Sequence, residues 1–184
     1  NMDLVVRIPT IPKPGETLLG GVFHTYPGGK GANQAVAASR LGAQVHMVGC
    51  VGEDSFGNEL RATLHAESID CTHVTVHPEE STGVALIQVD GRGQNSIALA
   101  GGANMCLGSA DVEHALQSIG KFDAVVIPLE IPLEAVATAA RIASDKGAMV
   151  ILNPAPAQVL APELLRLIDV LVPNEHEIAV MTSV

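Results

Sequence analysis

The sequence predicts an α/β fold in which a parallel sheet with helices on both faces is joined to a small antiparallel β lid. Apolar residues make up 47% of the 184 residues, yet there are only three Phe, one Tyr and no Trp, so the core is aliphatic. Aliphatic layers suit parallel strands that are covered by helices. Strand-like and helix-like stretches alternate in the second half of the chain, which also favours a parallel sheet. Two separate hairpin patterns in the first half predict the lid.

The first half of the chain is expected to contain two strand pairs that flank a helical region. Glycines followed by an Ala-rich stretch start the first helix, and Gly42 ends it. Asp54 is a suitable N-cap for the second helix. The expected elements are strands 4–8 and 17–23, a helix within 28–42, strand 45–51, a helix over 54–68, and strands 74–76, 82–89 and 96–99. We expect residues 1–23 and 82–99 to form the lid.

The second half of the chain alternates regularly between the two kinds of element. The expected order is helix 109–119, strand 124–127, helix 133–146, strand 149–152, helix 162–168, strand 170–172 and a helix from residue 175. Such βαβ repetition implies a parallel sheet covered by helices. Together with residues 24–81, residues 100–184 are therefore expected to form the body of the protein. The chain lacks an initial Met and stops inside the last expected helix, so we expect both ends to be truncated.

Composition excludes several classes of function. The formal charge of −10 opposes sequence-independent nucleic-acid binding. No apolar stretch reaches the length of about 20 residues that a membrane span needs, and no signal-peptide pattern opens the chain, so a cytoplasmic protein is expected. The cysteines Cys50, Cys71 and Cys106 form no CxxC pair, so they predict neither a disulfide framework nor a zinc site.

The segment YPGGKGANQA is the most informative motif. Its glycines let the backbone approach a ligand, and they bring Lys30 and Asn33 to a helix N-terminus, where free N–H groups can bind a polar group. It is not a P-loop, because His24 and Gly31 stand where Gly and Ser or Thr are needed. It is not a dinucleotide-binding motif either, because Gln34 replaces the third glycine. The alternative interpretation is a glycine turn before a helix with a solvated lysine.

Several motifs together resemble the ribokinase-like sugar kinase family. GGKGANQAVAASRLGA, STGVALI, GGAN, LEIPLEAV, NPAPA and PNEHE occur in the order seen in that family, and the resemblance covers essentially the whole chain. Fructokinases of the family are similar to GGAPANVAVALARLG and carry an Asp-Pro-Asn motif in place of NPAPA. Lys30, Gln34 and the NPAPA motif therefore favour the ribose-phosphorylating branch.

The resemblance implies a sugar site built from three parts of the chain. The family has an Asn-x-Asp motif after its first strand, and Asn1 to Asp3 match it. The carboxylate of Asp3 is suited to accept hydrogen bonds from adjacent sugar hydroxyls. Glu130 follows an expected strand at the carboxyl edge of the sheet, where ligands gather, although Pro128 replaces a Gln that the family often has. The sugar-binding residues implied are Asn1, Met2, Asp3, Gly29, Lys30, Gly31, Ala32, Asn33 and Glu130. Without the resemblance, Asp3 is interpreted as a solvated charge.

Near the end of the chain, Asn174 and Glu177 resemble the family's Asn-x-x-Glu motif. The resemblance implies that Asn174 contacts ATP and that Glu177 acts on Mg²⁺ through water, which suits a hard ion that keeps several waters. The same pair also fits a helix cap, and both interpretations can hold together. The family's catalytic Asp, its anion hole and its adenine-binding segments lie farther along the chain, so no catalytic residue is expected here.

The resemblance implies phosphorylation of D-ribose by ATP at the 5-hydroxyl. It also implies Mg²⁺, a monovalent cation such as K⁺, and a homodimer formed through the β lid. We expect this fragment to be inactive alone, because the catalytic base is missing. Two alternatives stay open: another sugar or nucleoside kinase of the family, or a non-catalytic sugar-binding module.

Overall fold

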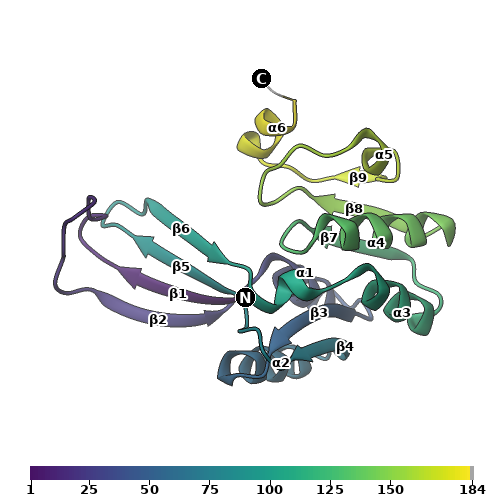
Figure 1. The fold of residues 1–184 in the computed structure, drawn as a ribbon, viewed down its shortest axis with the longest axis horizontal. Helices are drawn as coiled ribbons and strands as arrows, with labels where there is room; N and C mark the ends of the chain where they lie inside the picture. Colours follow the sequence, from purple (N-terminus) through teal and green to yellow (C-terminus); the bar gives the residue numbers. More distant parts are fainter. Residues whose placement is uncertain (183–184) are drawn as a thin grey trace.

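The computed structural model describes residues 1–182, in which a four-stranded lid projects from an α/β body (Figure 1). The lid elements are β1 (Met2–Arg7), β2 (Val22–Pro27), β5 (Val84–Val89) and β6 (Asn95–Ala100). The body elements are α1 (Lys30–Arg40), β3 (His46–Gly52), α2 (Ser55–Ala66), β4 (Asp70–His77), the 3₁₀ helix η1 (Gly102–Cys106), α3 (Ser109–Ile119), β7 (Ala124–Pro128), α4 (Leu133–Asp145), β8 (Met149–Asn153), α5 (Pro162–Leu165), β9 (Val170–Leu171) and α6 (Glu175–Thr182).

The lid is a mixed sheet rather than an antiparallel one. Its strand order is β2-β1-β5-β6, and β1–β2 and β5–β6 are antiparallel hairpins as the sequence predicts. The pairing of β1 with β5 is parallel. The reason is that both strands leave the body in the same direction, so the two hairpins join through their outgoing strands (Figure 1). The second strand also begins at Val22 instead of residue 17 and ends at Pro27, beyond the expected lid boundary at residue 23.

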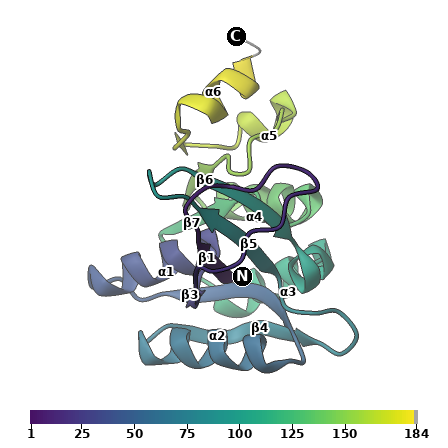
Figure 2. The ribbon, with the colours of Figure 1, turned by 90° about the vertical axis from the view of Figure 1, so that its left-hand side faces the viewer.

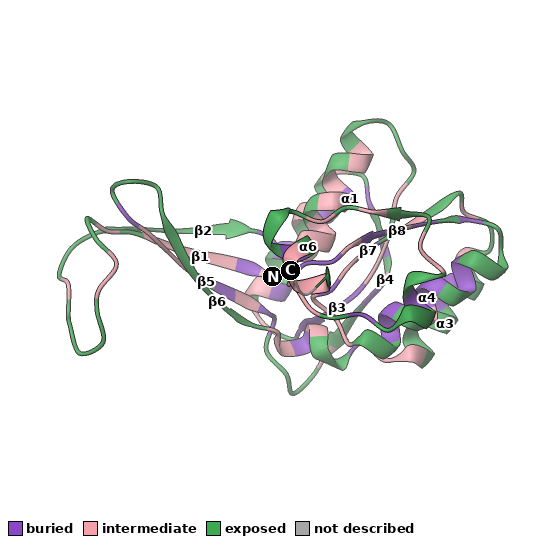
Figure 3. Ribbon diagram, turned by 90° about the horizontal axis from the view of Figure 1, so that it is seen from above, coloured by how far each residue is buried: buried purple, intermediate pink, exposed green. Residues whose placement is uncertain are grey.

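The body contains two separately hydrogen-bonded parallel sheets instead of one. One sheet pairs β3 with β4, and the other has the order β7-β8-β9. The main apolar core lies between β7–β8 and helices α3 and α4, where the buried face of α4 is lined by Ala135, Val136, Ala140 and Ala143. In Figure 3 the buried residues concentrate in this body, while the lid is largely exposed. Small side chains on α4 let the helix approach the sheet closely.

Most element boundaries agree with the sequence patterns to within about two residues, and β4 and α5 join β2 as exceptions. β4 is longer than the expected 74–76, because the whole stretch from Asp70 pairs with β3 even though its outward positions are polar. Helix α5 ends at Leu165 rather than at residue 168. The helix η1 was not expected at all. None of the helices within residues 1–182 is long and apolar enough to cross a membrane.

Candidate functional site

Three distant parts of the chain meet where the lid joins the body. In Figure 2 the chain start on β1 lies close to α1 and β7. The Lys30 backbone N–H donates to Glu130 Oε2 at 2.9 Å, and Lys30 Nζ lies 3.4 Å from Glu130 Oε1. The Asp3 carboxyl is close enough to both residues for their charges to influence its pKa. Asp3, Lys30 and Glu130 therefore form one charged cluster, which we call the junction cluster.

Glu130 also caps helix α1 from a distant part of the sequence. The N-cap residue of α1 is Gly29, which has no side chain to accept a hydrogen bond from the first turn. Glu130, placed by the loop after β7, supplies that acceptor to Lys30 N–H. A carboxylate at a helix N-terminus is stabilised by the partial positive charge there. The pairing fixes the glycine-rich turn relative to the carboxyl end of β7.

The Asp3 carboxylate packs against the backbone of Gly28. A Cβ added to Gly28 would overlap the carboxylate of Asp3, so glycine is needed at this position for space. Burial raises the pKa of Asp3 above its usual 3.8, and Glu130 adds to the rise, while Lys30 opposes it. Asp3 is therefore a partly desolvated acceptor that a hydrogen-bond donor would stabilise in its charged form.

The other residues of the expected sugar site play different parts. Gly29 has φ +88°, and a Cβ there would lie 2.7 Å from the backbone N of Asn1, so its conformation and its surroundings both require glycine. Gly31 packs beside Pro128. Asn33 is exposed one helical turn into α1.

Two residues expected at the sugar site have side chains that pack within the protein. Met2 is 0% exposed, and its N–H donates to the Gly83 carbonyl at 2.8 Å. Ala32 packs against the apolar cluster around α1 and β3. Met2 is thus not accessible to a ligand in this structure, whereas the junction cluster presents side chains.

Sequence reasoning missed Asn104. This residue lies in η1, directly after the lid, and its Nδ2 donates to Asn1 Oδ1 at 2.7 Å and to the Gly101 carbonyl at 2.9 Å. The only signal for it was its place in the GGAN motif. Because the contact joins residues 103 positions apart, local patterns could not reveal it.

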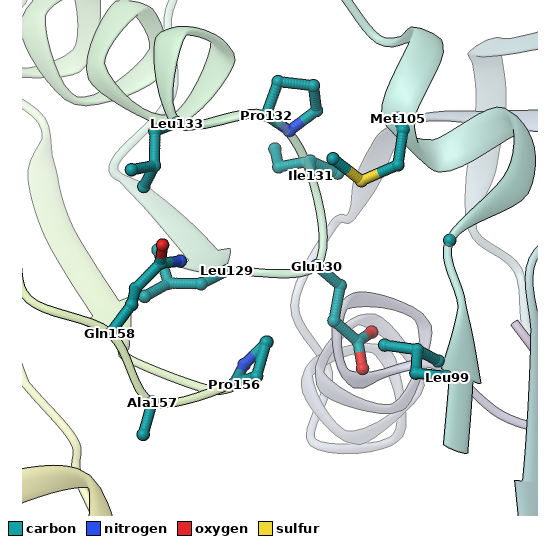
Figure 4. Close-up of a pocket in the computed structure, with 11 residues that line it drawn as sticks. Leu99, Met105, Leu129, Glu130, Ile131, Pro132, Leu133, Pro156, Ala157 and Gln158 are labelled. Carbon is teal, nitrogen blue, oxygen red and sulfur yellow. The ribbon is translucent and has the colours of Figure 1, made fainter. Parts of the chain in front are cut away.

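A cavity of about 380 Å³ adjoins the junction cluster. Figure 4 shows Glu130 at one side of it, with Leu99 and Met105 from the lid exit nearby and Pro156 from the loop after β8 opposite. Of the expected sugar-binding residues only Glu130 lines this cavity, and most of its lining is apolar. The junction cluster suits a sugar better than this cavity does, because polar recognition of a sugar needs several hydrogen-bonding groups.

The branch-specific motifs are brought together in the structure. Gln34 Nε2 lies 3.4 Å from Asn153 Oδ1, and Asn153 Nδ2 donates to the Val172 carbonyl at 2.9 Å. Gln34 Oε1 is buried and accepts no hydrogen bond from residues 1–182. These contacts connect α1 with the carboxyl ends of β8 and β9.

Asn174 and Glu177 form a helix cap at the end of the molecule opposite α2 (Figure 2). Glu177 N–H donates to Asn174 Oδ1 at 2.8 Å. In return, both carboxylate oxygens of Glu177 accept hydrogen bonds from Asn174, at 2.8 and 2.9 Å. Glu177 is only 7% exposed. Residues 1–182 contain no group of three or more His, Cys, Asp or Glu side chains placed to hold a metal ion.

The fold and the junction define a lid-bearing α/β protein with charged side chains gathered beside the carboxyl end of β7, the edge at which ligands bind in parallel α/β folds. The family model of the pfkB family carbohydrate kinases matches residues 1–184. The chain belongs to the pfkB family of carbohydrate kinases.

Individual relatives agree with this assignment. A ribokinase from Haemophilus influenzae is 47% identical over 184 residues, which cover 100% of this chain and 60% of that protein. A deoxyribokinase from Salmonella typhi is 39% identical, over 99% of this chain and 60% of that protein. The structure of Arabidopsis thaliana ribokinase complexed with ribose and ATP matches with a TM-score of 0.85 at 33% identity, over 100% of this chain and 60% of that one. The ribokinase-like fold is thus confirmed, and the chain spans about 60% of the length of these relatives.

Proposed function

We propose that the whole protein is an ATP-dependent sugar kinase that phosphorylates D-ribose at the 5-hydroxyl to give D-ribose 5-phosphate. The observation that carries the proposal is the junction cluster. Asp3 and Glu130 accept hydrogen bonds from sugar hydroxyls, while Lys30 donates them. The relatives named ribokinase, one of them seen with ribose and ATP, support ribose and ATP as the ligands.

In this proposal the residues of the chain mainly bind and orient the sugar. Asn1, Asp3, Lys30, Asn33 and Glu130 contact it through side chains, and the turn around residues 29–32 contacts it through the backbone. Positioning of this kind can supply a large part of the rate enhancement in phosphoryl transfer. The base that removes the proton of the 5-hydroxyl is proposed to be an Asp beyond residue 184, as the family resemblance implies.

Two residues near the end of the chain are proposed to act on the nucleotide and its metal ion. Asn174 is proposed to contact ATP, and Glu177 to act on Mg²⁺ through water once the rest of the protein is present. A monovalent cation such as K⁺ is proposed from family resemblance alone. Both carboxylate oxygens of Glu177 already accept hydrogen bonds from Asn174, which favours a contact to Mg²⁺ through water over a direct one. A cytoplasmic location is part of the same proposal.

We also propose that the lid forms a homodimer. Residues opposite one another in the strand register share a face, so Asp3, Ala85 and Leu99 lie on one side of the lid. The exposed apolar residues on that side are Val22, Tyr26, Ile97 and Leu99. A second lid on this side would cover them, while Phe23 and Leu86 stay exposed on the other face.

A deoxyribose kinase is the second candidate function. The observation in its favour is the Salmonella typhi deoxyribokinase, which is 39% identical to this chain. The two sugars differ by one hydroxyl. A site built to hydrogen-bond that hydroxyl rejects the sugar that lacks it, so the ratio of kcat/KM for the two sugars separates the candidates.

Release of ADP by the whole purified protein tests the proposal. The assay would supply ATP with D-ribose, 2-deoxyribose, fructose or adenosine, and NMR would identify the phosphorylated oxygen. We expect the highest kcat/KM with ribose and a product phosphorylated at the 5-position. Binding of ribose without ADP release would indicate a non-catalytic sugar-binding module instead. Residues 1–184 alone are expected to release no ADP, and turnover by that fragment would contradict the assignment of the base to a later segment.

A further inference from the structure

Asn104 occupies a constrained position between the lid and the start of β1. It follows the lid strand β6 by way of Gly101 and Gly102, and its Nδ2 contacts both Gly101 O and Asn1 Oδ1, at 2.9 and 2.7 Å. Gly83, at the entry to the lid, lies directly against this pair. A Cβ added to Gly83 would overlap Asn1 Oδ1 and Asn104 Nδ2. The two amides are therefore clamped at the point where the chain enters and leaves the lid.

The orientation of both amides follows from one backbone carbonyl. The Gly101 carbonyl can only accept a hydrogen bond, so Asn104 must turn its NH₂ group toward it. The second hydrogen of the same NH₂ group is directed to Asn1, which must then present Oδ1. The NH₂ group of Asn1 is thereby turned away from Asn104.

We propose that Asn104 is a positioning residue of the sugar site, which holds Asn1 so that its NH₂ group donates to a sugar oxygen. This inference rests on the proposed function. A sugar hydroxyl both donates and accepts hydrogen bonds, whereas Asp3 and Glu130 only accept. Lys30, the donor of the junction cluster, is already paired with Glu130. A second donor of fixed direction completes the recognition of the hydroxyl oxygens.

The proposal predicts an order of effects that a role in filling space alone would reverse. In Asn104→Asp the carboxylate can only accept, so the Asn1 amide turns its NH₂ group toward residue 104 and presents oxygen to the sugar. In Asn104→Ala the Asn1 amide is free to take either orientation. We expect the sugar KM to rise about 10- to 100-fold in Asn104→Asp and about 3- to 10-fold in Asn104→Ala. If Asn104 only filled space, the isosteric Asp would be the milder change and Ala the more severe one.

A variant of Asn1 tests the same inference without altering Asn104. Asn1→Asp still offers an oxygen to Asn104 Nδ2 but has no NH₂ group for the sugar. We expect its sugar KM to match that of Asn104→Asp. The matched control is Asn58→Asp, which makes the same chemical change at an exposed position on α2, and it should leave the sugar KM unchanged.

The measurement is steady-state kinetics of the whole protein, with KM for sugar and for ATP determined separately. Circular dichroism at the assay temperature identifies the folded variants. Variants at Asn104 and at Asn1 test the inference independently, so it can be judged even if one of them does not fold. Positioning of the sugar predicts a rise in sugar KM with an unchanged KM for ATP. Equal KM values in Asn104→Asp and Asn58→Asp, a larger effect of Ala than of Asp, or an unchanged KM in Asn1→Asp would each overturn the inference. None of these three outcomes would affect the proposed function as long as the wild-type protein phosphorylates a sugar. Failure of wild type to bind or phosphorylate any sugar would overturn the proposed function and this inference together.

Discussion

Replacement of Asp3 by Asn in the whole protein separates its proposed role in binding from any role in stability. The change keeps the size of the side chain and one carbonyl acceptor but removes the charge. A hydrogen bond to a charged group contributes about 1.5–3 kcal/mol, and each 1.36 kcal/mol corresponds to about tenfold in rate. Loss of one such bond therefore predicts a fall of about 10- to 150-fold in kcat/KM for the sugar.

The stability of the same variant should change in a different way. Because burial is the largest cause of the raised pKa of Asp3, the ionised form is disfavoured in the folded protein. The contribution of protonated Asp3 to the free energy of unfolding is fully present below its usual pKa of 3.8. It is lost as the pH rises through the raised pKa of the folded protein. The neutral Asn avoids this loss, so at pH 7 Asp3→Asn should have a free energy of unfolding equal to or above that of wild type. Below pH 3.8 the difference should disappear.

Two further variants make the test specific. Gly28→Ala leaves Asp3 in place but adds a Cβ that overlaps its carboxylate, so we expect a comparable loss of kcat/KM for the sugar. Asp123→Asn makes the same chemical change at an exposed position before β7 and should have no effect. The assays are sugar-dependent ADP release and urea denaturation. An Asp3→Asn variant that is less stable than wild type but retains its kcat/KM would refute the reasoning.

Two other predictions concern the N-cap of α2 and the lid. Asp54 accepts hydrogen bonds from Gly57 N–H and from both the N–H and the hydroxyl of Thr82, which is 2% exposed, so Asp54→Ala should lower the free energy of unfolding by about 1–3 kcal/mol at pH 7. Burial alone would raise the pKa of Asp54, but these hydrogen bonds lower it overall. The stabilisation by Asp54 is therefore present above pH 3.8 and lost as the pH falls through the lowered pKa. If urea denaturation showed the same difference in free energy of unfolding between wild type and Asp54→Ala at pH 2 as at pH 7, this reasoning would be contradicted. Ile97→Lys places a charge on the apolar face of the lid and should convert the proposed dimer to monomers in sedimentation equilibrium, while Ala98→Lys on the opposite face should not. Equal dissociation by both variants would argue against that face as the interface.

Patterns within short stretches of sequence predicted most elements of this protein correctly. Helix α3 has the expected bounds, Ser109–Ile119, and Asp54 caps α2 as expected. These features depend on contacts between residues a few positions apart, such as the bond from Gly57 N–H to the Asp54 carboxylate. The alternation of strands and helices in the second half of the chain could likewise be predicted from short-range patterns. The motif resemblance added the family, which the comparisons confirm.

The tertiary structure decided how distant residues combine at the junction. The parallel pairing of β1 with β5, the cap that Glu130 provides for α1 and the contact between Asn1 and Asn104 all join parts of the chain that are far apart. The sequence alone shows glycines at positions 28 and 83, but it could not show that they make room for Asp3 and the Asn1 amide. The physical reason is that propensity and capping act over a few residues, whereas these contacts depend on the packing of whole elements. The same limit explains why Asn174 and Glu177 could be predicted as a helix cap from their spacing, while their part in an ATP site stays a proposal.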